Sequence, residues 1–263
     1  MNIEKHYQEW NENLRQEYCS IFPNASSIIW DGVVDSTSYY NSPLKLMFIN
    51  KESPDKECYN LSAVIREQIL NKELLFQGYG NFKKSIMRET ALFKLLEKGD
   101  IKNITPKQVE RALDGINDRT FSKQFAECAI CNIKKCNGKK YSSTKDLRMY
   151  LNKGKKILEA QIDFFNPSII IGGNVCDNLL ESYFEWGENL YAYECEKSIK
   201  IYQIEVNGKL FPYFDLYHPS AFGKYSIDKT YCLRIWDAIQ KVEQEEPHFW
   251  DKTLHRRCFG CYD

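Results

Sequence analysis

The sequence predicts an α/β fold with a central, mostly parallel sheet of about four strands in a three-layer α/β/α arrangement. Short apolar runs alternate along the chain with longer segments of helical periodicity. This alternation is typical of a parallel sheet covered by helices on both faces. The chain has 263 residues, of which 43% are hydrophobic, so it is also large enough to bury one substantial core.

The first half of the chain is expected to begin with a helix over Ile3–Cys19, where Tyr7, Trp10, Leu14 and Tyr18 form one apolar stripe. Two strands and two helices follow, at Ile28–Val34, Leu44–Ile49, Leu61–Ile69 and Lys83–Lys98. Thr105-Pro106 is typical of a helix N-cap followed by proline at the first helical position.

The second half is expected to alternate in the same way. We predict strands at Cys128–Ile133 and Ser168–Ile171, and helices at Ser143–Phe164, Val175–Tyr183 and Ser226–Glu243. Asn207-Gly208 indicates a hairpin between Lys200–Val206 and Leu210–Leu216. We divide the chain into an N-terminal helix (1–25), a main domain (26–244) and an irregular C-terminal tail (245–263).

Charge composition argues against a protein that coats nucleic acid, because 36 Lys and Arg balance 36 Asp and Glu. A local basic stretch remains at Cys131–Lys156. The polar N-terminus does not resemble a signal peptide, and no apolar run is long enough to span a bilayer. We therefore expect a soluble, cytoplasmic protein.

The ten cysteines include two CxxC pairs, Cys128/Cys131 and Cys258/Cys261. The pairs could combine in a zinc or iron–sulfur site. However, Cys128 and Cys131 lie in a predicted strand, where side chains three apart point to opposite faces. The tail pair lacks an evident partner pair. We therefore expect free thiols, no metal and no cofactor.

Polar side chains follow the predicted strands. Glu52 comes shortly after the first buried strand, Asn132 lies at the end of the second, and His218 follows the last. Ligands of parallel sheets bind beyond the C-terminal ends of the strands. We therefore expect Glu52, Asn132 and His218 to surround one cleft at that edge.

The segments KESP (51–54), AICNIKK (129–135), QIDFFNPSIIIGG (161–173) and YHPSAF (217–222) appear in this order. This order resembles the uracil-DNA glycosylase superfamily, and it is most similar to a bacterial branch with a Y-H-P-S motif. The resemblance covers about residues 28–239. The sequence departs from the family where Ile49-Asn50 replaces a glycine opening and where Ser53 separates Glu52 from Pro54.

The resemblance implies hydrolysis of the N-glycosidic bond of a base that is flipped out of DNA. Glu52, with Asp55 as a fallback, would stabilise the oxocarbenium-like sugar and orient a water molecule. His218 would stabilise the leaving base anion. The amide of Asn132 would read the edge of a pyrimidine, and Tyr79 or Phe82 would stack on it.

The same resemblance implies a DNA partner with an altered or deaminated base, bound by a monomer. Phe222 is the candidate wedge into the gap left by the base, although a buried loop anchor is an equal alternative. Candidate phosphate contacts are Ser220, Lys224, Lys134, Lys135, Lys139 and Lys140. Two further functions stay open: a non-catalytic base- or DNA-binding module of the same fold, and a hydrolase of free nucleosides or nucleotides.

Overall fold

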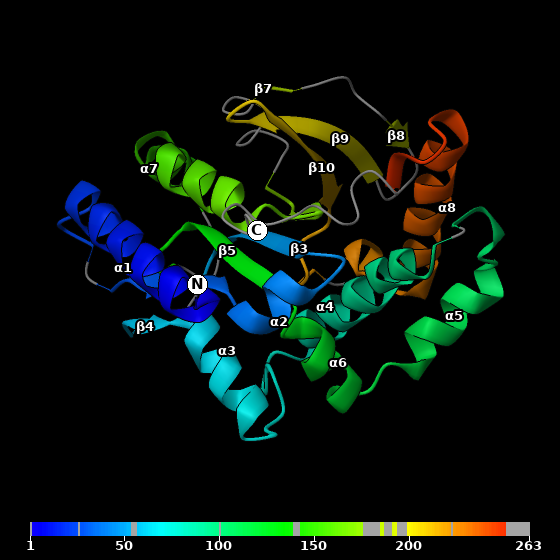
Figure 1. Ribbon diagram of the computed structural model, residues 1–263, viewed down its shortest axis with the longest axis horizontal. Helices are drawn as coiled ribbons and strands as arrows, with labels where there is room; N and C mark the ends of the chain where they lie inside the picture. Colours follow the sequence, from blue (N-terminus) through cyan, green and yellow to red (C-terminus); the bar gives the residue numbers. More distant parts are fainter. Residues whose placement is uncertain are drawn as a thin grey trace.

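A computed structural model describes residues 2–25, 27–53, 57–99, 101–138, 143–175, 185–186, 191–193, 199–221 and 223–250. Its main sheet has eight strands (Figure 1). The central four are parallel and lie in the order β5 (Cys128–Lys134), β3 (Leu46–Glu52), β6 (Ile169–Gly173) and β10 (Lys209–Leu216). The predicted α/β class and the four parallel strands are confirmed.

Antiparallel strands extend the sheet at both ends, so the whole sheet is mixed. At one end β2 (Gly32–Val33) pairs with β5. At the other end β9 (Ile199–Val206) pairs with β10, and it also pairs with β7 (Glu185–Trp186) and β8 (Tyr191–Tyr193). The hairpin turn predicted between β9 and β10 is present, with Asn207 at φ 51° and Gly208 at φ 75°.

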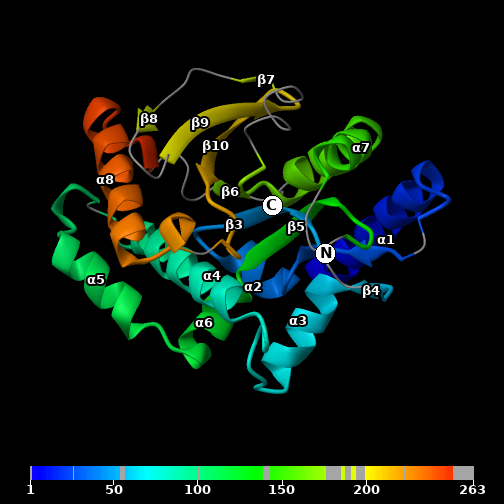
Figure 2. The ribbon, with the colours of Figure 1, turned by 180° about the vertical axis from the view of Figure 1, so that it is seen from behind.

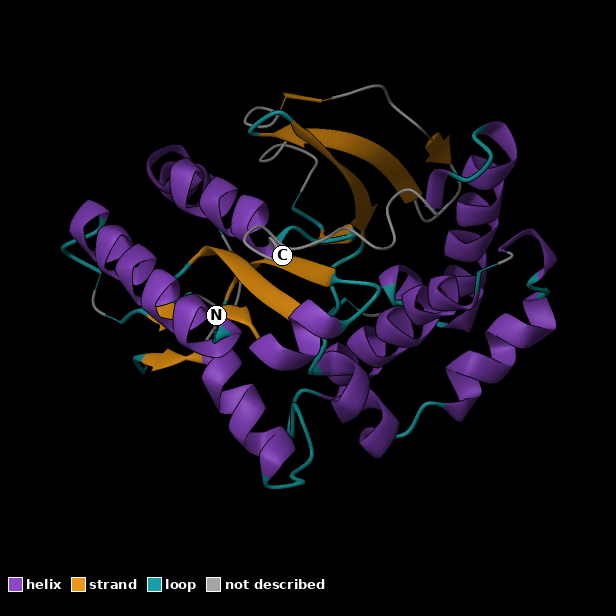
Figure 3. Cartoon of the chain, viewed as in Figure 1, coloured by secondary structure: helices purple, strands orange, loops and turns teal. Residues whose placement is uncertain are grey.

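Helices cover both faces of the sheet, as Figures 2 and 3 show. Phe48 of β3 faces one apolar cluster and Met47 faces the other, as expected for alternating side chains. The Phe48 face is covered by α3 (Leu61–Leu70), α4 (Gly80–Phe93), α5 (Pro106–Gly115), α6 (Asp118–Phe125) and α8 (Lys229–Glu245). The Met47 face is covered by α7 (Thr144–Phe165), with α1 (Ile3–Ile21) and α2 (Ser36–Asn41) beside it.

The strand predicted at Ile28–Val34 is divided into two. Its first part, β1 (Ile29–Trp30), pairs in parallel with β4 (Tyr59–Asn60) outside the main sheet, whereas β2 belongs to the main sheet. Gly32 has a φ of 154°, and a Cβ there would lie 2.6 Å from the hydroxyl of Tyr7. This glycine conformation redirects the chain between the two sheets.

Several helices begin or end at other residues than predicted. The segment predicted as Lys83–Lys98 begins earlier, in α4, and ends in the 3₁₀ turn η1 (Lys94–Lys98). Short 3₁₀ turns also lie at η2 (Ile101–Asn103) and η4 (Gly223–Tyr225). Thr105 caps α5 with a reciprocal Gln108 contact, as a capping box does. The predicted helix Val175–Tyr183 lies almost entirely outside the described residues.

The segment after residue 244 is not simply an irregular tail. In its described part, Phe249 and Trp250 are buried in the same cluster as Phe48. The Trp250 indole donates to the carbonyl of Ile239 at 3.0 Å and stacks on Phe214. The core therefore continues beyond the predicted domain boundary. No helix in the described part of the chain has the length and apolar character that a membrane crossing requires.

Candidate functional site

A cavity of about 140 Å³ lies at the C-terminal ends of the parallel strands. Six predicted site residues line it: Glu52, Tyr79, Phe82, Asn132, His218 and Ser220. The other lining residues are Asn50, Ser53, Tyr59, Leu61, Phe76 and Ile130. The structure therefore brings together the three strand-end residues on which the sequence prediction depends, Glu52, Asn132 and His218.

The alternation of side chains along the strands explains this convergence. Phe48, Asn50 and Glu52 point to the same face of β3 because they are two residues apart. Ile130 and Asn132 have the same relation on β5, and Asn50 lies directly opposite Asn132 in the register. The apolar core therefore gives way to polar groups on the same face, at the edge of the sheet.

Gly173, the last residue of β6, allows the neighbouring strand ends to approach closely. A Cβ at this position would lie 2.7 Å from Oδ1 of Asn50 and 3.0 Å from Pro219. Asn50 is a site residue that was not predicted from the sequence. Its position directly after the apolar residues of a strand could have indicated a site residue. Its contact with Gly173 could not have been predicted, because the two residues meet only in the tertiary structure.

Glu52 is almost completely covered. Only 4% of its side chain is exposed, and its Oε2 lies 3.0 Å from Nζ of Lys134, its neighbour in the β3–β5 register. Lys134 also pairs with Asp146 of α7 at 2.6 Å. Burial opposes the charge of Lys134, but Asp146 and Glu52 outweigh it and raise the lysine pKa. Gly138 packs so closely on Glu52 that a Cβ would lie 2.5 Å from Cγ.

His218 is a neutral hydrogen-bond donor at pH 7. The backbone N–H of Ser220 donates to Nδ1 at 3.1 Å, so the imidazole proton is on Nε2. Burial, together with the nearby charge of Lys51, lowers the pKa of His218 to about 4. Because His218 lines the cavity, its Nε2–H is available to an acceptor there.

Asn132 is held by its backbone, which leaves its side chain for the cavity. Its N–H donates to Asp31 at 2.6 Å, and its carbonyl accepts from Lys135 at 3.0 Å. Among the described residues, none hydrogen-bonds to its side-chain amide. The residue is only 4% exposed and lines the cavity, so its amide is a donor and acceptor that a molecule in the cavity can reach.

Aromatic rings also line the cavity. Phe82 packs against Phe76 at 5.0 Å between ring centroids, with planes 73° apart. Tyr79, directly before α4, remains 48% exposed. Phe76 was not identified from the sequence. It lies in a loop and has a left-handed backbone with φ at 53°, which is uncommon for a residue other than glycine and which no sequence pattern here indicates.

Two of the predicted phosphate contacts are wrong. Lys135 is 1% exposed, with Nζ 2.5 Å from the buried carboxylate of Asp31 and over the ring of Trp30. Lys134 is buried between Glu52 and Asp146. Both lysines satisfy buried carboxylates inside the fold, so neither ammonium is available to a phosphate.

The remaining candidates are exposed or undescribed. Lys224 is exposed and its Nζ lies 5.1 Å from the ring centroid of Tyr225. The outer face of α7 presents further basic side chains: Lys145, Arg148, Lys153 and Lys156. Asp55, Lys139, Lys140 and Phe222 lie outside the described residues.

The described cysteines are free thiols. Cys128 and Cys131 lie in the two different apolar clusters, as predicted for opposite faces of a strand. Within the described ranges, no three His, Cys, Asp or Glu side chains are arranged to hold a metal ion. Cys258 and Cys261 lie outside them.

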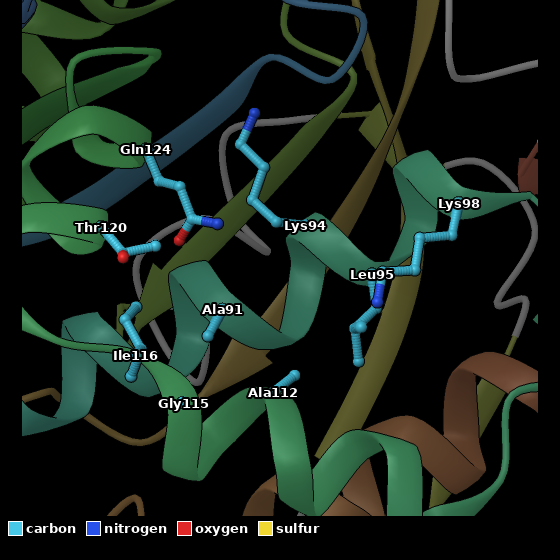
Figure 4. A pocket seen from close by; sticks show the side chains of 9 residues that line it. All are labelled: Ala91, Lys94, Leu95, Lys98, Ala112, Gly115, Ile116, Thr120 and Gln124. Atoms are coloured by element: carbon cyan, nitrogen blue, oxygen red, sulfur yellow. The ribbon is translucent and has the colours of Figure 1, made fainter.

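A second cavity, of about 230 Å³, lies between α4, α5 and α6 (Figure 4). Lys94 lines it, but its ammonium pairs with Glu127 at 2.5 Å and with Glu97 at 2.6 Å. Lys94 also donates to the carbonyl of Leu44, just before β3 begins. This cavity is therefore at the opposite end of the sheet from the predicted site residues, and none of them lines it.

No protein-family model matches the sequence, and a search of the curated proteins finds no match. Assignment of a function therefore depends on the chemistry of the strand-end cavity.

Proposed function

We propose that the protein is a monomeric, cytoplasmic DNA glycosylase that hydrolyses the N-glycosidic bond of uracil or a modified pyrimidine in DNA. One observation carries the proposal: Asn132, Glu52 and His218 line a single cavity of about 140 Å³. A cavity of about 150 Å³ holds one benzene molecule. The volume therefore suits one pyrimidine ring.

Recognition of the base begins with the Asn132 amide. A pyrimidine edge presents a ring N–H donor beside a carbonyl acceptor, and the amide offers the complementary pair. The amide lines the cavity and makes no hydrogen bond to a described residue, which supports the assignment because both of its groups remain for a base. Phe82 and Tyr79 offer ring faces on which the base can stack.

Hydrolysis breaks the bond between C1′ and the base nitrogen. The electron pair of that bond leaves with the base, and the sugar becomes oxocarbenium-like. Nε2–H of His218 donates to the carbonyl oxygen on which the negative charge develops, without transferring its proton. Glu52 stabilises the cation and orients a water molecule, whose hydroxyl adds to C1′ while its other proton neutralises the base.

One observation favours a second function, a non-catalytic module that binds a base in DNA. The carboxylate of Glu52 is 4% exposed and lies 3.0 Å from the Lys134 ammonium. This ion pair reduces the negative field that Glu52 offers to a cation. In that case Glu52 has a structural role, and the cavity binds an extruded base without cleaving it.

The proposal is tested by incubating the protein with single- and double-stranded oligonucleotides that carry uracil or altered pyrimidines. Hot alkali then cleaves the strand at each abasic site. Strand cleavage on at least one altered base supports the glycosylase. Tight binding without cleavage of any oligonucleotide supports the binding module. Release of uracil from free deoxyuridine, but not from DNA, supports the nucleoside hydrolase.

A further inference from the structure

A wider groove opens beside the base-sized cavity. It has a volume of about 580 Å³, roughly four times that of the cavity of about 140 Å³. The two share the side chains of Tyr59, Leu61, Phe76 and Tyr79. Beyond these shared residues, the groove continues along α3, where Val64 and Gln68 line it.

The lining of this groove suits nucleobases better than phosphates. Val64 is 38% exposed and Tyr79 is 48% exposed, so apolar and aromatic surface is open to solvent. Among the described residues that line the groove there is no lysine or arginine, and Glu57 is the charged residue. A phosphate would therefore meet a negative charge and apolar side chains. A flat, uncharged base would stack on the aromatic rings and find the amides of Gln68 and Gln77 at its edges.

We propose that this groove binds an unpaired nucleobase next to the extruded base, so that the protein acts on single-stranded or locally unpaired DNA. The inference depends on the proposed function for the identity of the ligand. A neighbouring base within a duplex is stacked and paired, and its release costs a further few kcal/mol. The groove is too large to be filled by a small substituent on the extruded base.

The test uses a fluorescent seven-nucleotide single strand with a central 2′-fluorinated deoxyuridine. The fluorine disfavours the sugar cation, so binding is measured without cleavage. Companion strands replace the nucleotide on one side of the uridine, or on both sides, with an abasic tetrahydrofuran. Stacking of one base on an aromatic ring changes affinity by about 5- to 150-fold. We expect wild-type affinity to fall within this range when the base that occupies the groove is absent.

Val64→Glu adds a charge in the groove without altering the cavity, since Val64 lines only the groove. Leu70→Glu is the matched control because Leu70 is on the same helix, is 69% exposed and does not line the groove. We expect Val64→Glu to weaken binding of the intact strand at least fivefold, and to match wild type on the strand with two abasic neighbours. We expect Leu70→Glu to match wild type on both strands.

Three outcomes overturn the inference: wild-type affinity that is insensitive to abasic neighbours, equal losses for Val64→Glu on both strands, and equal losses for Val64→Glu and Leu70→Glu. A preference for bulky 5-substituents combined with insensitivity to neighbours would also overturn it and assign the groove to the substituent. The proposed function has a separate test: it fails if no oligonucleotide loses a base. The binding measurement does not require catalysis, so its outcome is independent of that test.

Discussion

At the scale of single residues, one hydrogen bond determines what His218 can contribute. The Ser220 N–H donates to Nδ1 at 3.1 Å, so the imidazole proton is on Nε2 and is left for an acceptor in the cavity. Burial and Lys51 lower the pKa of His218 to about 4, so the imidazole is neutral over the physiological range. His218 is therefore suited to stabilise an anion by hydrogen bonding, and not to supply a proton as an imidazolium acid.

This pKa predicts a pH-dependent contribution to stability. In the unfolded chain His218 has a pKa of about 6.5, against about 4 in the folded protein. Between these values the unfolded state binds the extra proton, so stability is lost as the pH falls from about 6.5 to 4. His218→Asn removes this loss. Urea unfolding at pH 7 and pH 4.5 measures the free energy of unfolding of both proteins. The value for wild type minus the value for the variant should be smaller at pH 4.5 than at pH 7. If this wild-type-minus-variant value were unchanged or larger at pH 4.5, it would contradict the assigned tautomer and burial of His218.

Lys135 provides a second prediction at this scale. Removing one partner of a buried ion pair leaves the other charge uncompensated, which typically costs about 3–5 kcal/mol. We expect Lys135→Ala to lower the free energy of unfolding by about this amount, because Asp31 is completely buried. The exposed Lys145→Ala on α7 should change it by less than about 0.5 kcal/mol. A stable Lys135→Ala protein with weakened DNA binding would restore the phosphate-contact interpretation.

At the scale of elements, the site arises from the periodicity of two strands and from the loop that covers one of their ends. The apolar runs of β3 and β5 end in Asn50, Glu52 and Asn132, which share one face of the sheet. The loop after β5 then returns to β3, where the N–H of Gly138 donates to the carbonyl of Ser53 at 2.7 Å. Gly138 thereby encloses the Glu52 side chain.

Gly138→Ala tests the role of this loop. An added Cβ would lie within 2.5 to 2.8 Å of three Glu52 atoms, so the carboxylate or the loop must move. A misplacement of about 1 Å can cost about a hundredfold in rate. We expect base release to slow by about 10- to 100-fold, while Gly80→Ala, whose Cβ would meet nothing within 4 Å, leaves the rate unchanged. Equal rates for both variants would show that the loop does not position Glu52.

The strands and the convergence of their ends could be predicted from the sequence, because local apolar patterns and the geometry of parallel sheets are sufficient for both. The buried environment of Lys134 and Lys135 could not be predicted in this way. Lys135 reads as an exposed charge in a basic stretch, and its partner Asp31 is 104 residues earlier. Tyr79 and Phe82 were predicted as aromatic lining of the cavity, but Phe76 was not, since it reaches the cavity from a loop with left-handed residues at Lys72 and Phe76.

At the scale of the whole molecule, the C-terminal segment completes the core on the Phe48 face. Trp250 stacks on Phe214 of β10, two strands away from the Glu52 strand, and Phe249 packs against Trp250. From the sequence, both residues were predicted to lie in an irregular tail. Their burial therefore joins the end of the described chain to the sheet that supports the site.

Trp250→Ala should therefore destabilise the whole domain. Truncation of a buried tryptophan typically costs about 3–5 kcal/mol, and Trp250 is fully buried with its indole N–H satisfied by Ile239. Urea unfolding should show this loss as a lower midpoint. Tyr225→Ala, at a position 45% exposed, serves as the control and should shift the midpoint much less. A wild-type midpoint for Trp250→Ala would exclude the segment from the cooperative core.

We propose that Glu52 and His218 stabilise the transition state of base release. The test compares single-turnover rates of base release from the best altered-base oligonucleotide for wild type, Glu52→Gln and His218→Ala. Groups of this kind typically contribute on the order of a hundredfold or more. We predict that each variant loses at least this factor in rate and keeps its affinity for the oligonucleotide within a fewfold. Wild-type rates in both variants would contradict the claim, because the chemistry would then lie elsewhere in the protein.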